Sequence, residues 1–329
     1  MLRFLPIVLC VVILASIGVG YQKGIFPSLG NIAPGVQTVA PVESTGANVE
    51  TPVEIPTPTV TASPSPAAAA SGLAGPISPT PSAKPSPTPI PTPVVNNTPP
   101  GAGYSRQSVK TDIGTFTVSI VAADLGSTKV IVDTASTEDC RNDCPVLSLG
   151  DYVARNGAYA GINGSYFCPA TYPACADKKN SFDTLLMNKD KRYFNSDNNV
   201  YSTLPLAAFG AGWATFHGQT SSWGRDTGVD AVIANQPMLV QGGNNAFAGS
   251  SDAKQTSRGP RSFIGNKGST VYIGVVSSAT VGESAKTLHT MGLENALNLD
   301  SGGSTALWSG GYKAGPGRAI PNAVLFVKR

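Results

Sequence analysis

The sequence predicts an α+β fold, a single domain of mixed β-sheets flanked by a few helices over residues 104–329. Short runs rich in β-branched and aromatic residues recur along this region, as expected for strands. The chain holds 36 Gly and 27 Pro but only 13% charged residues, a balance that favours a β-rich, loop-rich domain over a helical one. Only two segments carry both a start and a stop signal for a helix.

The predicted strands follow from β-branched runs and the turns between them. Residues 115–122 and 129–135 are such runs, and we expect the turn at 124–127 to join them as a hairpin. Residues 261–265 and 270–277 flank Asn-Lys-Gly at 266–268, which predicts a second hairpin. Residues 319–327 are rich in Val, Leu and Phe, which indicates a final buried strand.

The two predicted helices are bounded by capping residues. One begins near Ser148 and ends at Gly157, and the other begins with the Thr280–Glu283 capping box and ends at Gly292. Each is followed by a short apolar strand that ends in Asn, at Asn163 and at Asn298. An internal duplication and convergent helix–turn–strand chemistry both explain this likeness, and either places the two Asn residues at equivalent strand ends.

An uncharged apolar run, residues 4–20, follows Arg3 near the N-terminus. It is long enough to be a retained membrane anchor, and the small residues near its end also permit signal-peptide cleavage. We therefore expect residues 1–23 to be a membrane anchor or a signal segment. In either case the rest of the chain is exported, so we predict an extracytoplasmic location, either membrane-anchored at the cell surface or secreted.

Residues 24–103 are dominated by Pro, Ser, Thr, Ala and Val, with almost no charge. Such a tract cannot bury a core and favours extended conformations, so we expect a disordered Pro-rich linker or stalk. The folded domain then occupies residues 104–329, a length compatible with one domain.

Four cysteines of the domain, Cys140, Cys144, Cys168 and Cys175, suit an oxidising compartment. Three disulfide pairings are possible. We favour the local one, Cys140–Cys144 with Cys168–Cys175, because it needs the least rearrangement of the chain. A zinc site is the weaker alternative, since no Cys-x-x-Cys spacing is present.

The charge pattern disfavours nucleic acid as a partner. The formal net charge is +3, and Lys and Arg form no basic stripe along the chain. Nucleic-acid-binding domains normally show such a stripe or patch.

Three Gly-containing segments stand out as motifs, at residues 161–167, 259–265 and 296–305. Together with the tail at 318–326, and in this order, they resemble the signature of the phosphodiester glycosidase family. The resemblance spans about residues 111–327. It implies a hydrolase that acts on phosphodiester-linked sugars, with a sugar-phosphate or polysaccharide as substrate. Ser301, Tyr166 and Ser262 depart from the family's usual residues, and Ser301 bears most on substrate identity.

The chemistry of the reaction assigns roles to the motif residues. Asp300 suits the positive charge that develops at the anomeric carbon, as a base, nucleophile or electrostatic stabiliser. Arg261 suits the phosphate, because its planar fork pairs two oxygens at once. Asn163 completes the expected catalytic set. A phosphate monoester leaves easily, so one strong carboxylate is enough, although Asp183, Asp230 or Glu294 could supply a second.

The remaining motif residues are expected to bind substrate. Asn298 offers the donor and acceptor groups that sugar hydroxyls need, the aromatic pair can stack on a sugar, and the glycine loop can cradle an anion. The expected set is Gly164, Tyr166, Phe167, Asn298, Ser301, Gly302, Gly303, Ser304 and Thr305. No metal or cofactor is indicated; a divalent cation near Asp300 is conceivable, but no carboxylate cluster demands one.

Each assignment has a structural alternative. Asp300 can cap a turn, Arg261 can belong to an ion pair, and Asn at a strand end often bonds turn backbone. Asn163 also begins a glycosylation sequon. The Asp-Ser-Gly-Gly segment at 300–303, after His217, is reminiscent of a serine hydrolase, but that His lacks the sequence context of a triad base. Loss of catalysis in a glycan-binding or wall-associated module is the second functional hypothesis.

Overall fold

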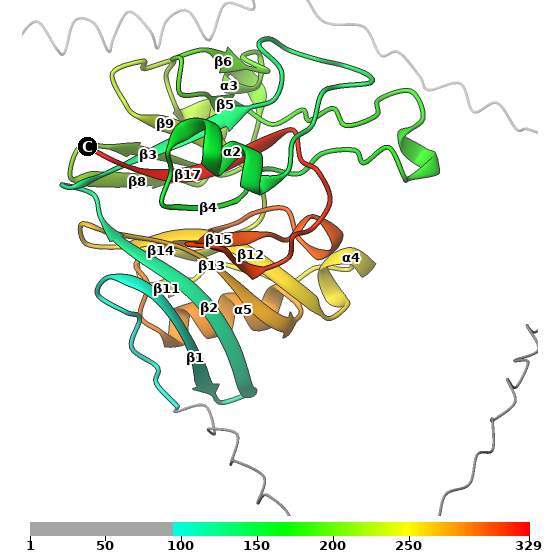
Figure 1. Cartoon of the computed structure of the whole chain (residues 1–329). Helices are drawn as coiled ribbons and strands as arrows, with labels where there is room; N and C mark the ends of the chain where they lie inside the picture. The colour runs from blue at the N-terminus through cyan, green and yellow to red at the C-terminus, as the bar shows by residue number, and fades with distance from the viewer. Residues whose placement is uncertain (1–94) are drawn as a thin grey trace, which may run out of the picture. The chain divides into compact units, whose positions relative to one another are not determined.

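Three β-sheets and a few short helices make up the part of the chain that the computed structural model describes, residues 95–329 (Figure 1). The first sheet has the order β1 (Gly103–Thr111), β2 (Gly114–Asp124), β13 (Thr270–Ala279), β12 (Gly259–Lys267), β14 (Asn295–Asn298), β10 (Met238–Gln241) and β11 (Asn244–Asn245). The second has the order β16 (Tyr312–Ala314), β15 (Leu307–Ser309), β4 (Ala160–Asn163), β17 (Asn322–Lys328) and β3 (Thr128–Thr134). The third has the order β6 (Tyr193–Phe194), β5 (Leu186–Met187), β9 (Ala231–Ala234), β7 (Leu206–Gly210) and β8 (Trp213–His217).

The helices are few, as predicted, and they are short. They are α2 (Leu149–Asn156), α3 (Asn198–Tyr201), α4 (Ala253–Thr256) and α5 (Val281–Thr290), with 3-10 turns η1 (Pro173–Cys175), η2 (Thr220–Ser222) and η3 (Gly302–Ser304). A sheet-rich domain with few helices is therefore confirmed. The strand pairs within the three sheets are all antiparallel, so the sheets are more uniform than the mixed sheets that we expected.

One of the two predicted hairpins is wrong, although both of its strands exist. β2 pairs with β1 and β13 in the first sheet, whereas β3 pairs with β17 in the second. Between them, Leu125 is fully buried and its N–H donates to the Ser269 carbonyl at 2.9 Å. The turn therefore leads the chain from one sheet into another. The β12–β13 hairpin is confirmed.

The main apolar core lies where the three sheets face one another. Ile264 on β12, Ile162 on β4 and Ile233 on β9 are fully buried members of one cluster. α5 packs on the other face of the first sheet, in a cluster that includes Leu288 (Figure 1). α2 packs with Leu325 on the outer face of the second sheet.

Both predicted helices begin and end where their capping residues indicate. Ser148 caps α2 and Thr280 caps α5, each in a complete capping box. Gly157 and Gly292, which follow the helices, have φ of 57° and 75°, a left-handed conformation that a glycine adopts without strain. Each glycine turns the chain into a four-residue buried strand, β4 or β14, that ends in Asn.

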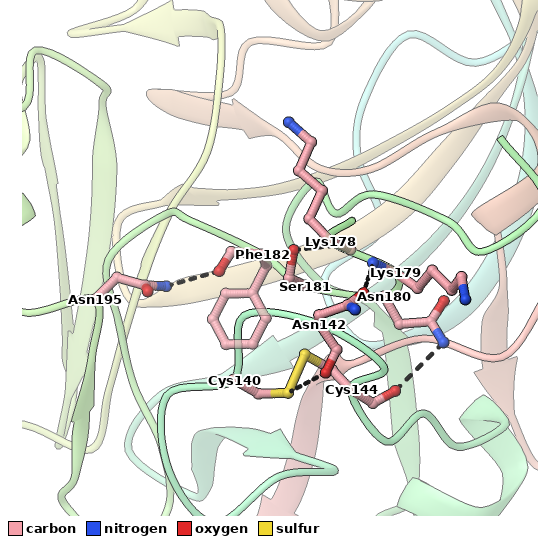
Figure 2. Close-up of a disulfide and its surroundings, with 9 residues drawn as sticks. All are labelled: Cys140, Asn142, Cys144, Lys178, Lys179, Asn180, Ser181, Phe182 and Asn195. Carbon is pink, nitrogen blue, oxygen red and sulfur yellow. Dashed lines mark hydrogen bonds between the residues drawn. A yellow bond between two sulfur atoms is a disulfide. The ribbon is translucent and has the colours of Figure 1, made fainter. Parts of the chain in front are cut away.

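The structure contains the two local disulfides, Cys140–Cys144 and Cys168–Cys175, so the favoured pairing is confirmed and none of these four thiols is free for zinc. Asn180 links the two disulfide loops through hydrogen bonds. Its backbone N–H donates to the Cys168 carbonyl at 2.6 Å, and its side-chain amide donates to the Cys144 carbonyl at 3.3 Å. Figure 2 shows the second of these bonds beside the Cys140–Cys144 bridge.

The expected membrane segment and most of the Pro-rich linker, residues 1–94, lie outside the described residues. Among residues 95–329, none of the helices has the length and apolar character needed to cross a bilayer.

Candidate active site

A cavity of about 460 Å³ opens where three loops meet. Tyr166 and Phe167 reach it from the loop after β4, and Arg261 from the start of β12. The loop after β14 contributes Asp300 and residues 301–304. The loops after the two strand ends that the sequence singled out thus line one cavity. β4 and β14 belong to different sheets and contribute Ile162 and Leu297 to one apolar core.

Asp300 is held in place through its main chain and partly withdrawn from water. Its N–H donates to the Gly164 carbonyl at 3.0 Å, and its carbonyl accepts the side-chain amide of Asn163 at 2.6 Å. Burial raises the pKa of the carboxyl group to about 6, although hydrogen bonds from Ser304 and Ser301 partly oppose this shift. A carboxyl group with such a pKa exchanges protons near neutral pH, which suits acid–base or nucleophilic chemistry.

Arg261 brings an unneutralised positive charge to the cavity. Its side chain is 6% exposed, and its guanidinium donates to the carbonyl of Ala279 at 2.9 Å and to that of Ser257. No carboxylate of residues 95–329 pairs with it. Carbonyls orient a guanidinium without cancelling its charge, so this fork can receive an anion. Burial lowers its pKa below the ordinary value.

Asn163 does not line the cavity. It is fully buried, and its side-chain oxygen accepts the Ser262 hydroxyl at 2.9 Å and the Ala306 N–H at 3.1 Å. With the bond to Asp300, its amide joins three segments of the chain. This geometry matches a side chain that orients the site from beneath, and the burial leaves no room for a glycan on the sequon in the folded domain.

Asn298 does not line the cavity either, and its side chain supports Tyr166. Its amide nitrogen donates to the Tyr166 hydroxyl at 2.7 Å and to the Gln236 carbonyl at 2.9 Å, whereas its amide oxygen is buried without a hydrogen-bond partner in residues 95–329. Asn235, which sequence reasoning missed, accepts the Tyr166 N–H at 3.0 Å and donates to the Asn298 carbonyl. Burial raises the pKa of Tyr166 to about 12, so its hydroxyl stays protonated.

The glycine-rich loops place backbone where side chains would not fit. A Cβ on Gly164 would overlap the Asn322 side chain and lie 2.8 Å from its carbonyl oxygen. Gly302 has φ of 65°, in the left-handed region. Residues 301–304 line the cavity, and so does Phe167, which also packs against the core. Gly164 and Thr305 do not line it, and Thr305 is buried.

Several cavity residues carried no recognisable motif. Tyr172 comes from the loop closed by the Cys168–Cys175 bridge, Asp252 and Lys254 come from the α4 region, and Arg318 precedes β17. Arg318 stands in the tail that the resemblance covers, and that was the one available signal for it. The others lie in irregular segments whose position depends on tertiary contacts.

The other candidate carboxylates and His217 lie elsewhere. The three residues named as possible second carboxylates, Asp183, Asp230 and Glu294, do not line the cavity. His217, on β8 of the third sheet, contacts Thr215 and the Trp223 ring and does not line it either. No group of three or more His, Cys, Asp or Glu within residues 95–329 is arranged to hold a metal ion.

The sequence profile of the phosphodiester glycosidase family matches residues 156–327. The chain belongs to the phosphodiester glycosidase family. The match covers all three motif segments and the tail with Arg318, and it supports a glycosidase-type hydrolase. No curated protein sequence matches the chain significantly.

Two solved structures share the fold of this family member. The catalytic domain of zebrafish N-acetylglucosamine-1-phosphodiester alpha-N-acetylglucosaminidase, auto-inhibited by its pro-peptide, superposes with a TM-score of 0.51 at 14% identity, over 72% of this chain and 87% of that chain. A hypothetical protein from Synechocystis superposes with a TM-score of 0.53 at 14% identity, over 69% of this chain. The matched region spans 62% of the Synechocystis chain.

Proposed function

We propose that this protein is an extracytoplasmic hydrolase that releases a sugar from a sugar-1-phosphodiester, or cleaves a related glycosidic bond, in a surface polysaccharide or glycoconjugate. One observation carries the proposal. The carboxylate of Asp300 and the unneutralised guanidinium of Arg261 line the same cavity. A carboxylate and a free cation are the two groups needed at the two ends of the bond that breaks.

The reaction places opposite charges on the two sides of the scissile bond. The bond between the anomeric carbon and the phosphate oxygen breaks, and its electron pair leaves with the phosphate. Asp300 stabilises the positive charge on the sugar, and it acts either as the base that activates water or as the nucleophile. Arg261 binds the departing phosphate. Water supplies the new hydroxyl of the sugar, and its second proton passes to Asp300 or to solvent.

Other residues, in the cavity wall and beneath it, bind the sugar and hold the acid in place. Tyr166 offers its hydroxyl and ring to the sugar, with Phe167 beside it. Asn163 acts as a positioning residue for Asp300, and Asn298 does the same for Tyr166. The N–H groups of the loop 302–304 face the anion.

The location outside the cytoplasm rests on two independent features. The two disulfides form readily in an oxidising compartment. The apolar run at residues 4–20 is the expected export signal or membrane anchor.

A non-catalytic glycan-binding module of the same fold is the alternative. Such a module would need the aromatic and amide groups but would gain nothing from a carboxyl group of raised pKa, because burying an acid costs free energy. Asp300 therefore favours the enzyme.

The test uses the full-length chain, purified in mild detergent, with a panel of sugar-1-phosphodiesters and p-nitrophenyl glycosides, with and without EDTA. We expect equimolar release of free sugar and phosphate monoester, lost in an Asp300→Asn variant that melts cooperatively. EDTA should leave the rate unchanged. Absence of turnover on every diester, together with measurable binding of surface glycan, would favour the binding module.

A further inference from the structure

Arg318 is a second cation of the cavity, and its positive charge acts on the Asp300 carboxyl, whose pKa it lowers, without a direct ion pair. It precedes β17, and its backbone N–H donates to the Gly303 carbonyl at 2.9 Å. Its guanidinium carbon lies 5.1 Å from the centroid of the Tyr172 ring. The Nη1 atom is buried and has no hydrogen-bond partner, and no carboxylate of residues 95–329 forms an ion pair with the side chain.

A buried guanidinium N–H without a partner is unusual, since burial removes its water and nothing replaces the lost hydrogen bonds. The packing around Arg318 holds it in this state. A Cβ on Gly303 would overlap Nη2, so the glycine backbone makes the space that the guanidinium occupies. The Tyr172 ring covers it from the disulfide-closed loop. The side chain as a whole is only partly buried and lines the cavity, so its positive charge can act on an anion bound there.

The other cations that line the cavity are engaged differently. Arg258 is exposed, and it forms an ion pair with Glu283 and donates to the Ser278 carbonyl. Lys254 is exposed and lies 5.6 Å from the centroid of the Tyr172 ring. Arg318 therefore differs from both in its buried and unsatisfied nitrogen.

We propose that Arg318 binds the departing phosphate and, with Arg261, forms a two-arginine clamp for the charge that develops during cleavage. This inference rests on the proposed function. A phosphodiester carries one negative charge, and after cleavage of the bond to the anomeric carbon the electron pair leaves a phosphate monoester with up to two. A second guanidinium therefore contributes more to the transition state than to the bound substrate, which raises the rate of the chemical step.

The clamp also predicts which substrates depend on Arg318. Diesters, whose leaving group is a phosphate, gain from both arginines. A p-nitrophenyl glycoside has an uncharged scissile linkage and gives a phenolate, so it has no phosphate for the clamp to hold.

The experiment compares the full-length parent with Arg318→Ala, Arg318→Lys and Gly303→Ala, and with Arg258→Ala as the matched control. Titration calorimetry with inorganic phosphate and with phenyl phosphate measures anion binding without turnover. We expect Arg318→Ala to weaken phosphate binding by at least about tenfold, the size of one lost charge-assisted hydrogen bond. Arg258→Ala should remain within about twofold of the parent, because that arginine is already paired.

Steady-state kinetics of the same variants are the second measurement. Arg318→Ala should lower kcat for the diester by more than it raises KM and leave p-nitrophenyl glycoside hydrolysis near the parent rate. Gly303→Ala keeps the arginine but displaces it, so a smaller loss in the same direction is expected. Arg318→Lys keeps the positive charge but removes the planar guanidinium. It replaces Arg318→Ala in the comparison if the alanine variant does not fold.

The outcomes separate this inference from the proposed function. If the parent hydrolyses diesters and folded Arg318 variants match it in phosphate affinity and kcat, the clamp is refuted and the function stands. If phosphate binding depends on Arg318 but no diester is cleaved, the anion site stands and the proposed function fails.

Discussion

Asn163 donates a 2.6 Å hydrogen bond from its side-chain amide to the main-chain carbonyl of Asp300. The bond joins the end of β4 to the loop after β14, and so joins two facing sheets at the wall of the cavity. The same amide accepts from Ser262 and from the Ala306 N–H. The position of Asp300 thus depends on a residue that does not line the cavity.

Removal of this amide should impair the chemical step more than substrate binding. For Asn163→Ala we expect kcat to fall roughly tenfold or more with little change in KM, because a small displacement of the acid is costly. The pH midpoint of activity should shift downward as water reaches Asp300. Stability should fall by about 3 kcal/mol, since buried partners lose their hydrogen bonds.

Ser262→Ala is the graded control for this prediction. It removes one donor and leaves the bonds of Asn163 to Ala306 and Asp300 intact. A loss of stability of about 1 kcal/mol with kcat close to the parent is expected. Equal kcat effects in the two variants would show that the Asn163–Asp300 bond has no special role.

The raised pKa of Asp300 predicts the sign of the pH dependence. The folded-state value is about 6, above the ordinary 3.8, so folding favours the protonated acid. Its contribution to stability is therefore greatest below pH 4 and is lost as the pH rises through 6. Activity, which needs the carboxylate, should change in the opposite direction and rise through about pH 6.

Unfolding and rate profiles from pH 4 to 8 check this prediction. Asp300→Asn should be inactive and more stable than the parent at pH 7, because it removes a buried charge. A rate that is highest near pH 5 and declines through 6 would instead mean that Asp300 works as a protonated acid.

Arg261→Lys tests whether the fork matters beyond its charge. A lysine cannot donate to both the Ala279 and the Ser257 carbonyls while it faces an anion. We expect KM for a diester to rise about tenfold or more, with a much smaller change for an uncharged p-nitrophenyl glycoside. Equal effects on both substrates would indicate that Arg261 only supports the fold.

Gly164 is predicted to be intolerant of any side chain. A Cβ there would overlap Asn322 and approach its backbone oxygen at 2.8 Å, so backbone must move. Gly164→Ala should lower stability by about 1–3 kcal/mol and reduce activity, because Gly164 accepts the Asp300 N–H. Gly224→Ala is the control, since nothing lies within 4 Å of its added Cβ. Thermal melts of both variants decide the matter, and equal melting temperatures would contradict the prediction.

Local chemistry was predictable from sequence, and pairing across the fold was only partly so. The capping boxes at Ser148 and Thr280 involve residues a few positions apart, and both helices start there. The β12–β13 hairpin depends on its own short turn. β3 pairs with β17, which lies nearly two hundred residues later in the chain. The sequence of the turn between β2 and β3 does not encode that pairing.

The candidate site was likewise predictable where a local motif marks a residue, and not where tertiary contacts decide its position. Asp300 and Arg261 stand in recognisable motifs, and both reach the cavity. Asn163 and Asn298 were expected to face the substrate but lie beneath the surface, because a strand-end residue points inward or outward according to register. Lys254 and Tyr172 come from irregular loops, where only the folded chain brings them to the cavity.

The position of bond cleavage tests the account most directly. The full-length protein would hydrolyse a sugar-1-phosphodiester in water enriched in oxygen-18, with mass spectrometry of both products and a no-enzyme control for exchange into the free sugar. Cleavage between the anomeric carbon and oxygen, in which Asp300 faces the sugar and Arg261 the phosphate, predicts label on the sugar and none on the phosphate monoester. Label on the phosphate would mean attack at phosphorus and would contradict a glycosidase.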